Sequence, residues 1–169
     1  MRQESTFYVA ASPLRVWSML ANLDEYRLWR PGTRITVRNP GAGSSFRYAR
    51  RTFWKKWLVV DATITDWDKG SAVGWRCGTD RLIGFTETYR IEDEGSGSRV
   101  RHSIEAIGFF GRLASRLVAN DILTAIELED AAFVNFVKRV MREPAAPNRH
   151  RRRAAKYQST NDRETDRRN

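Results

Sequence analysis

The sequence is poor in the residues that hold metals and disulfides. It has one cysteine, Cys77, and two histidines, His102 and His150, among 169 residues. A single cysteine excludes an intrachain disulfide and a cysteine-based metal cluster. The absence of disulfides is typical of proteins in a reducing compartment, so we expect a cytoplasmic protein. Because His150 lies far from the apolar part of the chain, a histidine-rich metal site is excluded as well. We expect neither a metal nor another cofactor.

Long apolar runs are also absent. No stretch approaches the roughly 20 apolar residues that span a bilayer, so we expect no transmembrane segment. Residues 1–6 lack the basic and then apolar layout of a secretory signal. Gly41 and Gly43 lack the further glycine and the helix of a phosphate-binding loop, and a serine nucleophile elbow is missing. The common signatures of nucleotide binding and serine hydrolysis are therefore not present.

Positive charge is concentrated at the C-terminal end. The formal net charge is +10; from Arg142 onward nine Lys or Arg stand against four Asp or Glu (+5), and the remaining 21 basic and 16 acidic residues give the other +5. Residues 143–169 contain the basic run 149–153 and no apolar period. We therefore expect a domain over residues 1–142 and a basic, disordered tail over 143–169. This tail either is a solvated end or makes weak, nonspecific contact with nucleic acid or an anionic membrane.

The first two thirds of the chain have the pattern of strands and short helices. Segment 5–9 is β-prone and ends at Ser12-Pro13, where proline fits the first position of a helix. That helix is followed by a second short one, which holds Tyr26 and Trp29. The apolar period then becomes two, in segments separated by turn-forming residues. The six predicted strands cover residues 35–37, 46–54, 58–64, 73–77, 83–91 and 99–106.

The stretch Phe109–Met141 has the period of one long helix. Its apolar residues recur at steps of mostly three or four, and Glu129 and Asp130 interrupt this stripe one turn after Ile126. We favour the interpretation that both carboxylates face water, because charges on helices are usually solvated. The alternative is that one of them points into an incompletely packed space, toward Arg50 or His102. The stripe consists of Leu113, Leu117, Ile122, Ile126, Phe133, Val137 and Val140.

This order of elements predicts an antiparallel sheet with one polar face and one apolar face, the apolar face packed against the long helix. Three stretches also resemble one family, the START-like, Bet v 1-like (SRPBCC) superfamily in its polyketide cyclase/dehydrase branch. They are Phe7-Tyr-Val-Ala-Ala-Ser-Pro-Leu-Arg-Val-Trp-Ser-Met-Leu with Asn22-Leu-Asp-Glu-Tyr-Arg-Leu-Trp-Arg-Pro-Gly, Gly95-Ser-Gly-Ser-Arg-Val-Arg-His-Ser-Ile-Glu, and Gly108-Phe-Phe-Gly-Arg-Leu.

The resemblance covers about Glu4 to Glu143. It implies an α+β helix-grip fold, in which a curved antiparallel sheet of about seven strands wraps a long C-terminal helix around a deep cavity, with two short helices after the first strand. Members of the superfamily include lipid carriers, hormone receptors, aromatase/cyclases, quinone-binding proteins and ribosome-associated factors. No family-wide catalytic motif carries over to this sequence.

Strand parity predicts which polar residues face the cavity. Side chains two apart on a strand point the same way, so Tyr48, Arg50, Glu87, Tyr89 and His102 share the apolar face. Glu87 and His102 lie on strands that we expect to be neighbours, so the two can meet. They are the candidate acid/base pair, with Arg50 or a tyrosine hydroxyl stabilising an oxyanion. The structural alternative is an internal Arg50–Glu87 ion pair and a core histidine with one hydrogen bond.

Six tryptophans are many for this length, and indoles can line a pocket for a flat or greasy ligand. Trp54 and Trp75 are the better pocket candidates, and we assign the other four to packing. Cys77 falls on the inward face as a small buried apolar residue. The predicted ligand-binding residues are therefore Tyr48, Arg50, Trp54, Trp75, Phe85, Glu87, Tyr89, His102, Ile104 and Phe133.

The first functional hypothesis is a binding protein for a hydrophobic or amphiphilic small molecule, such as a lipid, a quinone or an aromatic polyketide, held between the sheet and the final helix. The alternative is a cyclase or dehydratase that acts on a polyketide-like substrate through Glu87 and His102. A second alternative is an interaction protein that docks on RNA or ribosomes through its basic tail.

Overall fold

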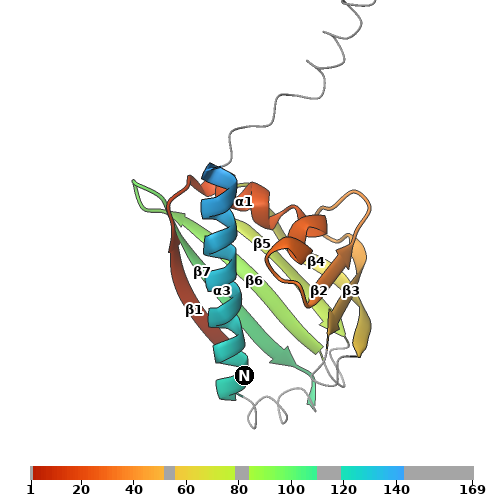
Figure 1. The fold of residues 1–169 in the computed structure, drawn as a ribbon. Coiled ribbons are helices and arrows are strands. Elements are labelled where there is room, and N and C mark those ends of the chain that lie inside the picture. The colour runs from red at the N-terminus through yellow and green to blue at the C-terminus, as the bar shows by residue number, and fades with distance from the viewer. Residues whose placement is uncertain (1, 52–55, 79–83, 110–118, 143–169) are drawn as a thin grey trace, which may run out of the picture. The chain divides into compact units, whose positions relative to one another are not determined.

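The computed structural model describes residues 2–51, 56–78, 84–109 and 119–142. Residues Met1–Lys138 form one compact unit, separate from Arg139–Asn169. The strands form one antiparallel sheet in the order β1-β7-β6-β5-β4-β3-β2 (Figure 1). They are β1 (Arg2–Val9), β2 (Thr33–Thr36), β3 (Ser45–Arg51), β4 (Trp57–Asp68), β5 (Ala72–Gly78), β6 (Gly84–Asp93) and β7 (Ser98–Ile107).

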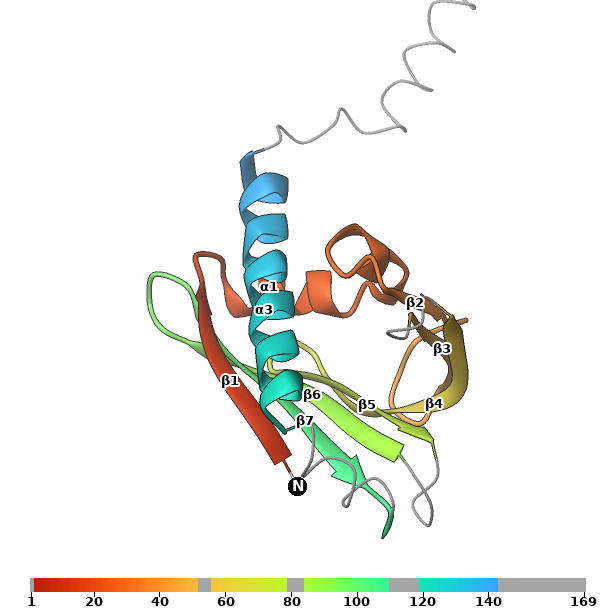
Figure 2. The same cartoon turned by 60° about the horizontal axis from the view of Figure 1, so that its bottom comes forward.

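The first two strands along the chain, β1 and β2, lie at opposite edges of the sheet. Strands β2 to β7 each pair with their neighbours along the chain, and β1 pairs with β7. The connection from β1 to β2 therefore passes from one edge of the sheet to the other, and it consists of α1 (Pro13–Leu20) and the 3₁₀ helix η1 (Leu23–Leu28). The sheet curves, and α1 lies on the same side of it as the long helix α3 (Ala119–Arg142) (Figure 2).

Both short helices form where they were predicted, with two differences in detail. The first begins at Pro13, but Ser12 makes no side-chain capping hydrogen bond. The second is a 3₁₀ helix, whose three residues per turn place Leu23, Tyr26 and Trp29 on one side. All three are buried, so this short element contributes a row of large side chains to the core.

The long helix differs from the expectation in its charged residues. Its described part begins at Ala119, and residues 110–118 of the predicted helix lie outside the described ranges. Ile126, Asp130, Phe133 and Val137 are buried at spacings of four, three and four, so Asp130 occupies a position of the core stripe. The interpretation that both carboxylates face water is wrong, because Glu129 and Asp130 both pair with residues on the other side of the core.

Large aromatic side chains fill much of the space between the sheet and α3. Trp75 is fully buried and its ring contacts those of Tyr26, Phe46, Tyr48 and Tyr89. The α+β fold with a seven-stranded antiparallel sheet, two short helices and a final helix is as predicted. Trp54 and the predicted tail 143–169 lie outside the described residues.

Cys77 is buried, as expected, and burial raises the pKa of its thiol. None of the helices within the described ranges is long and apolar enough to cross a membrane.

Candidate functional site

A chain of buried polar side chains connects α3 to the sheet. Arg30, just after η1, donates from Nη1 to Glu87 Oε1 over 2.7 Å. The same carboxylate oxygen lies 3.1 Å from His102 Nε2, and His102 Nδ1 lies 2.7 Å from Asp130 Oδ1 on α3. Ser5 on β1 donates its hydroxyl to the other oxygen of Asp130. Asp130 thus bonds α3 directly to Ser5 on β1 and His102 on β7, and His102 extends the chain of hydrogen bonds to Glu87 on β6.

The register of the sheet explains this arrangement. His102 on β7 is directly opposite Ser5 on β1 and Tyr89 on β6, so all three side chains point to the same face. The rings of Tyr89 and His102 stack with centroids 4.1 Å apart, and the Tyr89 hydroxyl donates to Glu87 Oε1 over 3.1 Å. Glu87, two residues before Tyr89, reaches His102 diagonally. The predicted contact between Glu87 and His102 is present.

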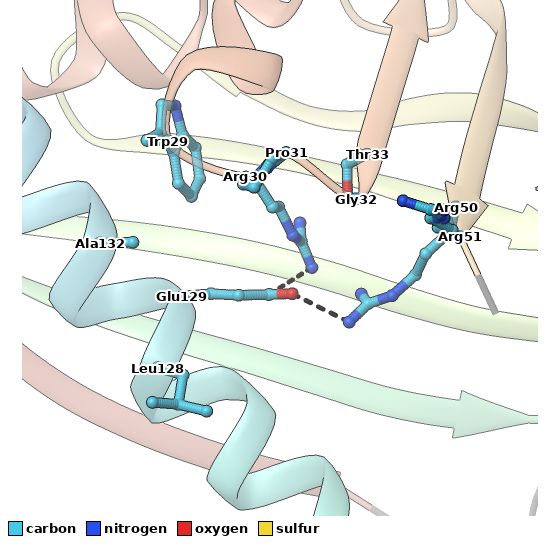
Figure 3. Close-up of a pocket in the computed structure, with 10 residues that line it drawn as sticks. All are labelled: Trp29, Arg30, Pro31, Gly32, Thr33, Arg50, Arg51, Leu128, Glu129 and Ala132. Atoms are coloured by element: carbon cyan, nitrogen blue, oxygen red, sulfur yellow. Dashed lines mark hydrogen bonds and ion pairs between the residues drawn. The ribbon is translucent and has the colours of Figure 1, made fainter. Parts of the chain in front are cut away.

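A second carboxylate on α3 joins two arginines. Glu129 Oε2 lies 2.5 Å from Arg30 Nη2, and Glu129 Oε1 accepts from Arg50 Nη2 over 2.9 Å. Figure 3 shows the two guanidinium groups converging on this carboxylate from η1 and β3. The considered ion pair between Arg50 and Glu87 is wrong, because Arg30 pairs with Glu87 and Arg50 pairs with Glu129. His102 likewise has two hydrogen-bonding partners and not one.

The charges of this network set each other's protonation. Burial by itself disfavours ionisation of Glu87, but Arg30 and the hydrogen bond and charge of His102 outweigh it and lower the pKa of Glu87 to about 2. Burial also disfavours the charged form of His102, yet its hydrogen bonds to Asp130 and Glu87 raise its pKa above the ordinary 6.5. The network therefore keeps Glu87 ionised near neutral pH and favours the protonated form of His102.

The neighbouring phenols stay protonated. Burial, followed by the charge of Glu87, raises the pKa of Tyr26 and of Tyr89 well above the ordinary value of 10.0. The pKa of the buried Arg30 is raised as well, because Glu87, Tyr48 and Glu129 outweigh the effect of its burial. The cluster thus offers phenol and guanidinium donors beside carboxylate acceptors. Within the described residues no group of His, Cys, Asp and Glu is arranged to hold a metal ion.

A pocket of about 260 Å³ opens beside the Arg30–Glu129–Arg50 group. Its apolar wall includes Trp29, Leu128 and Ala132, and the side chain of Leu128 is 67% exposed at the rim. The pocket lies between α3, the segment after η1, and β3 (Figure 3). Its described lining residues are Trp29, Arg30, Pro31, Gly32, Thr33, Arg50, Arg51, Leu128, Glu129 and Ala132.

The predicted ligand-binding residues divide between this pocket and the core. Arg50 lines the pocket. Phe85 and Ile104 are half-buried on the inner face of the sheet. The others within the described ranges are buried in the core, namely Tyr48, Trp75, Glu87, Tyr89, His102 and Phe133.

Sequence reasoning missed Arg30, Trp29 and Ser5. Trp29 was assigned to packing, although it both packs against Phe133 and lines the pocket. The alternation of β1 does place Ser5 on the inner face, so a signal for it existed. Arg30 follows the last turn of η1, where no strand or helix period indicates its direction.

The raised pKa of His102 has a consequence for stability. Because the folded protein binds this proton more tightly than the unfolded chain, its contribution is fully present below pH 6.5 and is lost as pH rises through the folded pKa. We expect the free energy of unfolding to fall as pH rises above about 6.5, by at most about 1.4 kcal/mol per pH unit. Urea unfolding across this range measures it. His102→Gln should remove the slope, and an equal slope in that variant would contradict the assignment.

A family model identifies the class of protein to which the chain belongs. The chain belongs to the polyketide cyclase/dehydrase and lipid transport family, whose model matches residues 2–145. This agrees with the START-like, Bet v 1-like resemblance seen in the sequence. No curated protein sequence matches the chain.

Solved structures share the helix-grip fold at low sequence identity. The protein TTHA0849 from Thermus thermophilus is 18% identical with a TM-score of 0.65, over 83% of this chain and 99% of that one. Ara h 8.0201 is 13% identical with a TM-score of 0.62, over 81% and 97%. The di-domain ARO/CYC StfQ from the steffimycin biosynthetic pathway is 11% identical with a TM-score of 0.66, over 83% of this chain and 51% of that di-domain chain.

Proposed function

We propose that the protein binds a small hydrophobic or amphiphilic molecule, of the lipid, quinone or aromatic polyketide type, between the sheet and α3. The observation that carries this proposal is the pocket itself, where an apolar wall of Trp29, Leu128 and Ala132 meets the charged side chains of Arg30 and Arg50. An amphiphile has the matching division into an apolar body and a polar end. The description of the family, polyketide cyclase/dehydrase and lipid transport, supports the same class of ligand.

The buried charges support a binding role. An internal ion pair rarely stabilises a protein more than well-packed apolar residues do, since desolvation of the charges offsets their attraction. Arg30, Glu87, His102 and Asp130 nevertheless stand together in the core, and Arg30 extends this network to the pocket. A ligand that uses these polar groups is a physical reason for keeping them.

The size of the pocket limits the ligand. A volume of about 260 Å³ lies just below the roughly 300–1,000 Å³ of ordinary small-molecule sites. The core aromatics, including Trp75 and Phe133, fill space that would otherwise extend the pocket toward the middle of the sheet. A bicyclic aromatic compound or the end of an acyl chain therefore suits the site.

The second candidate is a cyclase or dehydratase. Glu87, His102, Asp130 and the Tyr89 hydroxyl form the hydrogen-bonded arrangement that proton transfer requires. Neither Glu87 nor His102 belongs to the described lining of the pocket, however, and Arg30 stands between them and it. Because a permanently charged guanidinium cannot act as a base, we rank catalysis below binding.

Ala132 and its neighbour Ala131 provide a matched test. Ala132 lines the pocket, whereas Ala131 is exposed on the same helix. We expect isothermal titration calorimetry to show that 2-naphthol or 1-decanol binds the wild-type protein. In Ala132→Trp the added indole occupies the pocket, so affinity should fall about tenfold or more, which is about 1.4 kcal/mol. Ala131→Trp should bind like the wild type.

Equal binding by both variants, or no binding of either probe by the wild-type protein, would refute the proposed site. The same preparation separates the two candidate functions. Native mass spectrometry of the gently purified protein should show a bound molecule, and binding is supported if that molecule keeps both its mass and its chromatographic retention time after incubation. Loss of water from it, abolished by His102→Gln, would support the dehydratase.

A further inference from the structure

Glu129 differs from the other carboxylates of the network in its access to solvent. Its side chain is 16% exposed, compared with 6% for Asp130 and 0% for Glu87. It lines the pocket, while Asp130 and Glu87 are not among the described lining residues. Glu129 is therefore the carboxylate that can turn outward without crossing the core.

The helix does not depend on Glu129 alone for its polar attachment. Asp130, the next residue, is held separately by His102 and Ser5. Those bonds use neither Arg30 nor Arg50, so they persist when Glu129 leaves its two arginines. Movement of this one side chain is then compatible with an unchanged position of α3.

Arg30 and Trp29 each keep a buried donor that has no acceptor among the described residues. Arg30 is buried, and its Nε–H has no acceptor among the described residues. The indole N–H of Trp29 is likewise buried without such an acceptor, and both residues line the pocket. A buried donor without an acceptor costs free energy, so this wall of the pocket favours a partner that brings acceptor oxygens.

From this geometry we infer that Glu129 occupies the place of a ligand carboxylate. The ligand is an amphiphilic monocarboxylate with an aromatic or acyl body, and its carboxylate binds between Arg30 and Arg50 while Glu129 turns to solvent. The two guanidinium groups already converge on one carboxylate, with nitrogen to oxygen distances of 2.5 and 2.9 Å (Figure 3). This inference rests on the proposed binding function and assigns the chemistry of the ligand's polar end.

Charge balance makes the exchange selective. When a carboxylate replaces Glu129, the two arginines keep one anionic partner and the buried charge is unchanged. When a neutral ligand displaces Glu129, Arg50 is left without a carboxylate among the described residues, and Arg30 retains only Glu87. An unpaired charge in a partly buried site is costly, so neutral ligands are disfavoured at this position. Charge-assisted bonds to arginine add geometric preference for a carboxylate.

Two isosteric probes test the inference, namely 2-naphthoate and the neutral 2-naphthamide. By isothermal titration calorimetry near pH 7 we expect the wild-type protein to bind 2-naphthoate at least about tenfold more tightly than 2-naphthamide. Glu129→Gln removes the competing anion, so the affinity for 2-naphthoate should rise by about tenfold. The matched control is Glu127→Gln, which removes an equal charge from an exposed position of α3. It should leave both affinities unchanged.

Arg50→Gln removes one of the two guanidinium groups, so the preference for 2-naphthoate over 2-naphthamide should disappear. Thermal unfolding checks that this variant is folded. Equal affinities for the two probes in the wild-type protein would overturn the inference and leave the proposed binding function standing. So would an unchanged or weakened affinity for 2-naphthoate in folded Glu129→Gln. If neither these probes nor 2-naphthol bind the wild-type protein, the proposed function itself fails.

Discussion

Replacing Arg30 with methionine is expected to lower the free energy of unfolding by about 3–5 kcal/mol, the range for breaking a buried ion pair by removing one partner. Arg30 is 2% exposed and pairs with Glu87, which is fully buried. Methionine fills similar volume but leaves Glu87 with His102 as its remaining cationic partner among the described residues. Unfolding by urea at pH 7 measures the loss.

Arg27 provides the control for this variant. It belongs to η1, three residues before Arg30, and it is exposed. Arg27→Met should therefore change the unfolding free energy by no more than about 0.5 kcal/mol. The double variant Arg30→Met/Glu87→Gln should recover at least about 1 kcal/mol, because it removes the stranded charge. If Arg30→Met costs less than about 1 kcal/mol, the pair is solvated and the described network is wrong.

Phe133→Ala is the second change with a large expected effect, a loss of about 3–5 kcal/mol. The Phe133 side chain is 0% exposed and lies where α3 meets the aromatic core. Its ring centroid is 5.0 Å from that of Trp29 and 6.2 Å from that of Phe7. Removal of the ring leaves a cavity that these rigid neighbours cannot close, so the cost includes lost burial and lost contacts.

Leu128 is the matched control for Phe133. It lies on the same helix but is 67% exposed, so Leu128→Ala should cost no more than about 0.5 kcal/mol. Thermal and urea unfolding of both variants provide the comparison. Similar losses in the two variants would mean that α3 does not pack on the sheet through Phe133.

Phe133 and the adjacent carboxylates attach the same helix to the rest of the fold in different ways. Phe133 contributes burial, which is nondirectional, whereas Asp130 and Glu129 contribute hydrogen bonds that fix the rotation of α3 about its axis. Adjacent side chains on a helix point in different directions, so the two carboxylates reach separate partners. Asp130 bonds to His102 and Ser5, and Glu129 pairs with Arg30 and Arg50. One helical turn thus both closes the core and forms the charged end of the pocket.

Much of the fold was predictable from local sequence features. The period of two in each strand and the turn-forming residues between strands gave seven strands in the right order along the chain, and parity placed Tyr48, Glu87, Tyr89 and His102 on the inner face. Parity was reliable there because β3, β6 and β7 pair without interruption. The shift in register between Ile64 and Asp66 falls on β4, away from these residues.

The candidate site was predictable only in part. The contact between Glu87 and His102 follows from pairing of adjacent strands, which parity and chain order already suggest. The partners Arg30 and Glu129 depend on how η1 and α3 cross the sheet. That placement results from packing among Tyr26, Trp29 and Phe133, in which the contact between Trp29 and Phe133 joins residues more than a hundred positions apart.

The sequence by itself determined the antiparallel sheet, the final helix and the inward direction of the strand residues, because these depend on periods of two and 3.6 that any short segment displays. It could not decide that Glu129 and Asp130 face inward, since on a helix alone a charged pair is best solvated. Only the tertiary structure supplies Arg30, Arg50, His102 and Ser5 as their partners. Those four residues come from four separate segments of the chain, and it is their convergence that makes burial of two carboxylates physically acceptable.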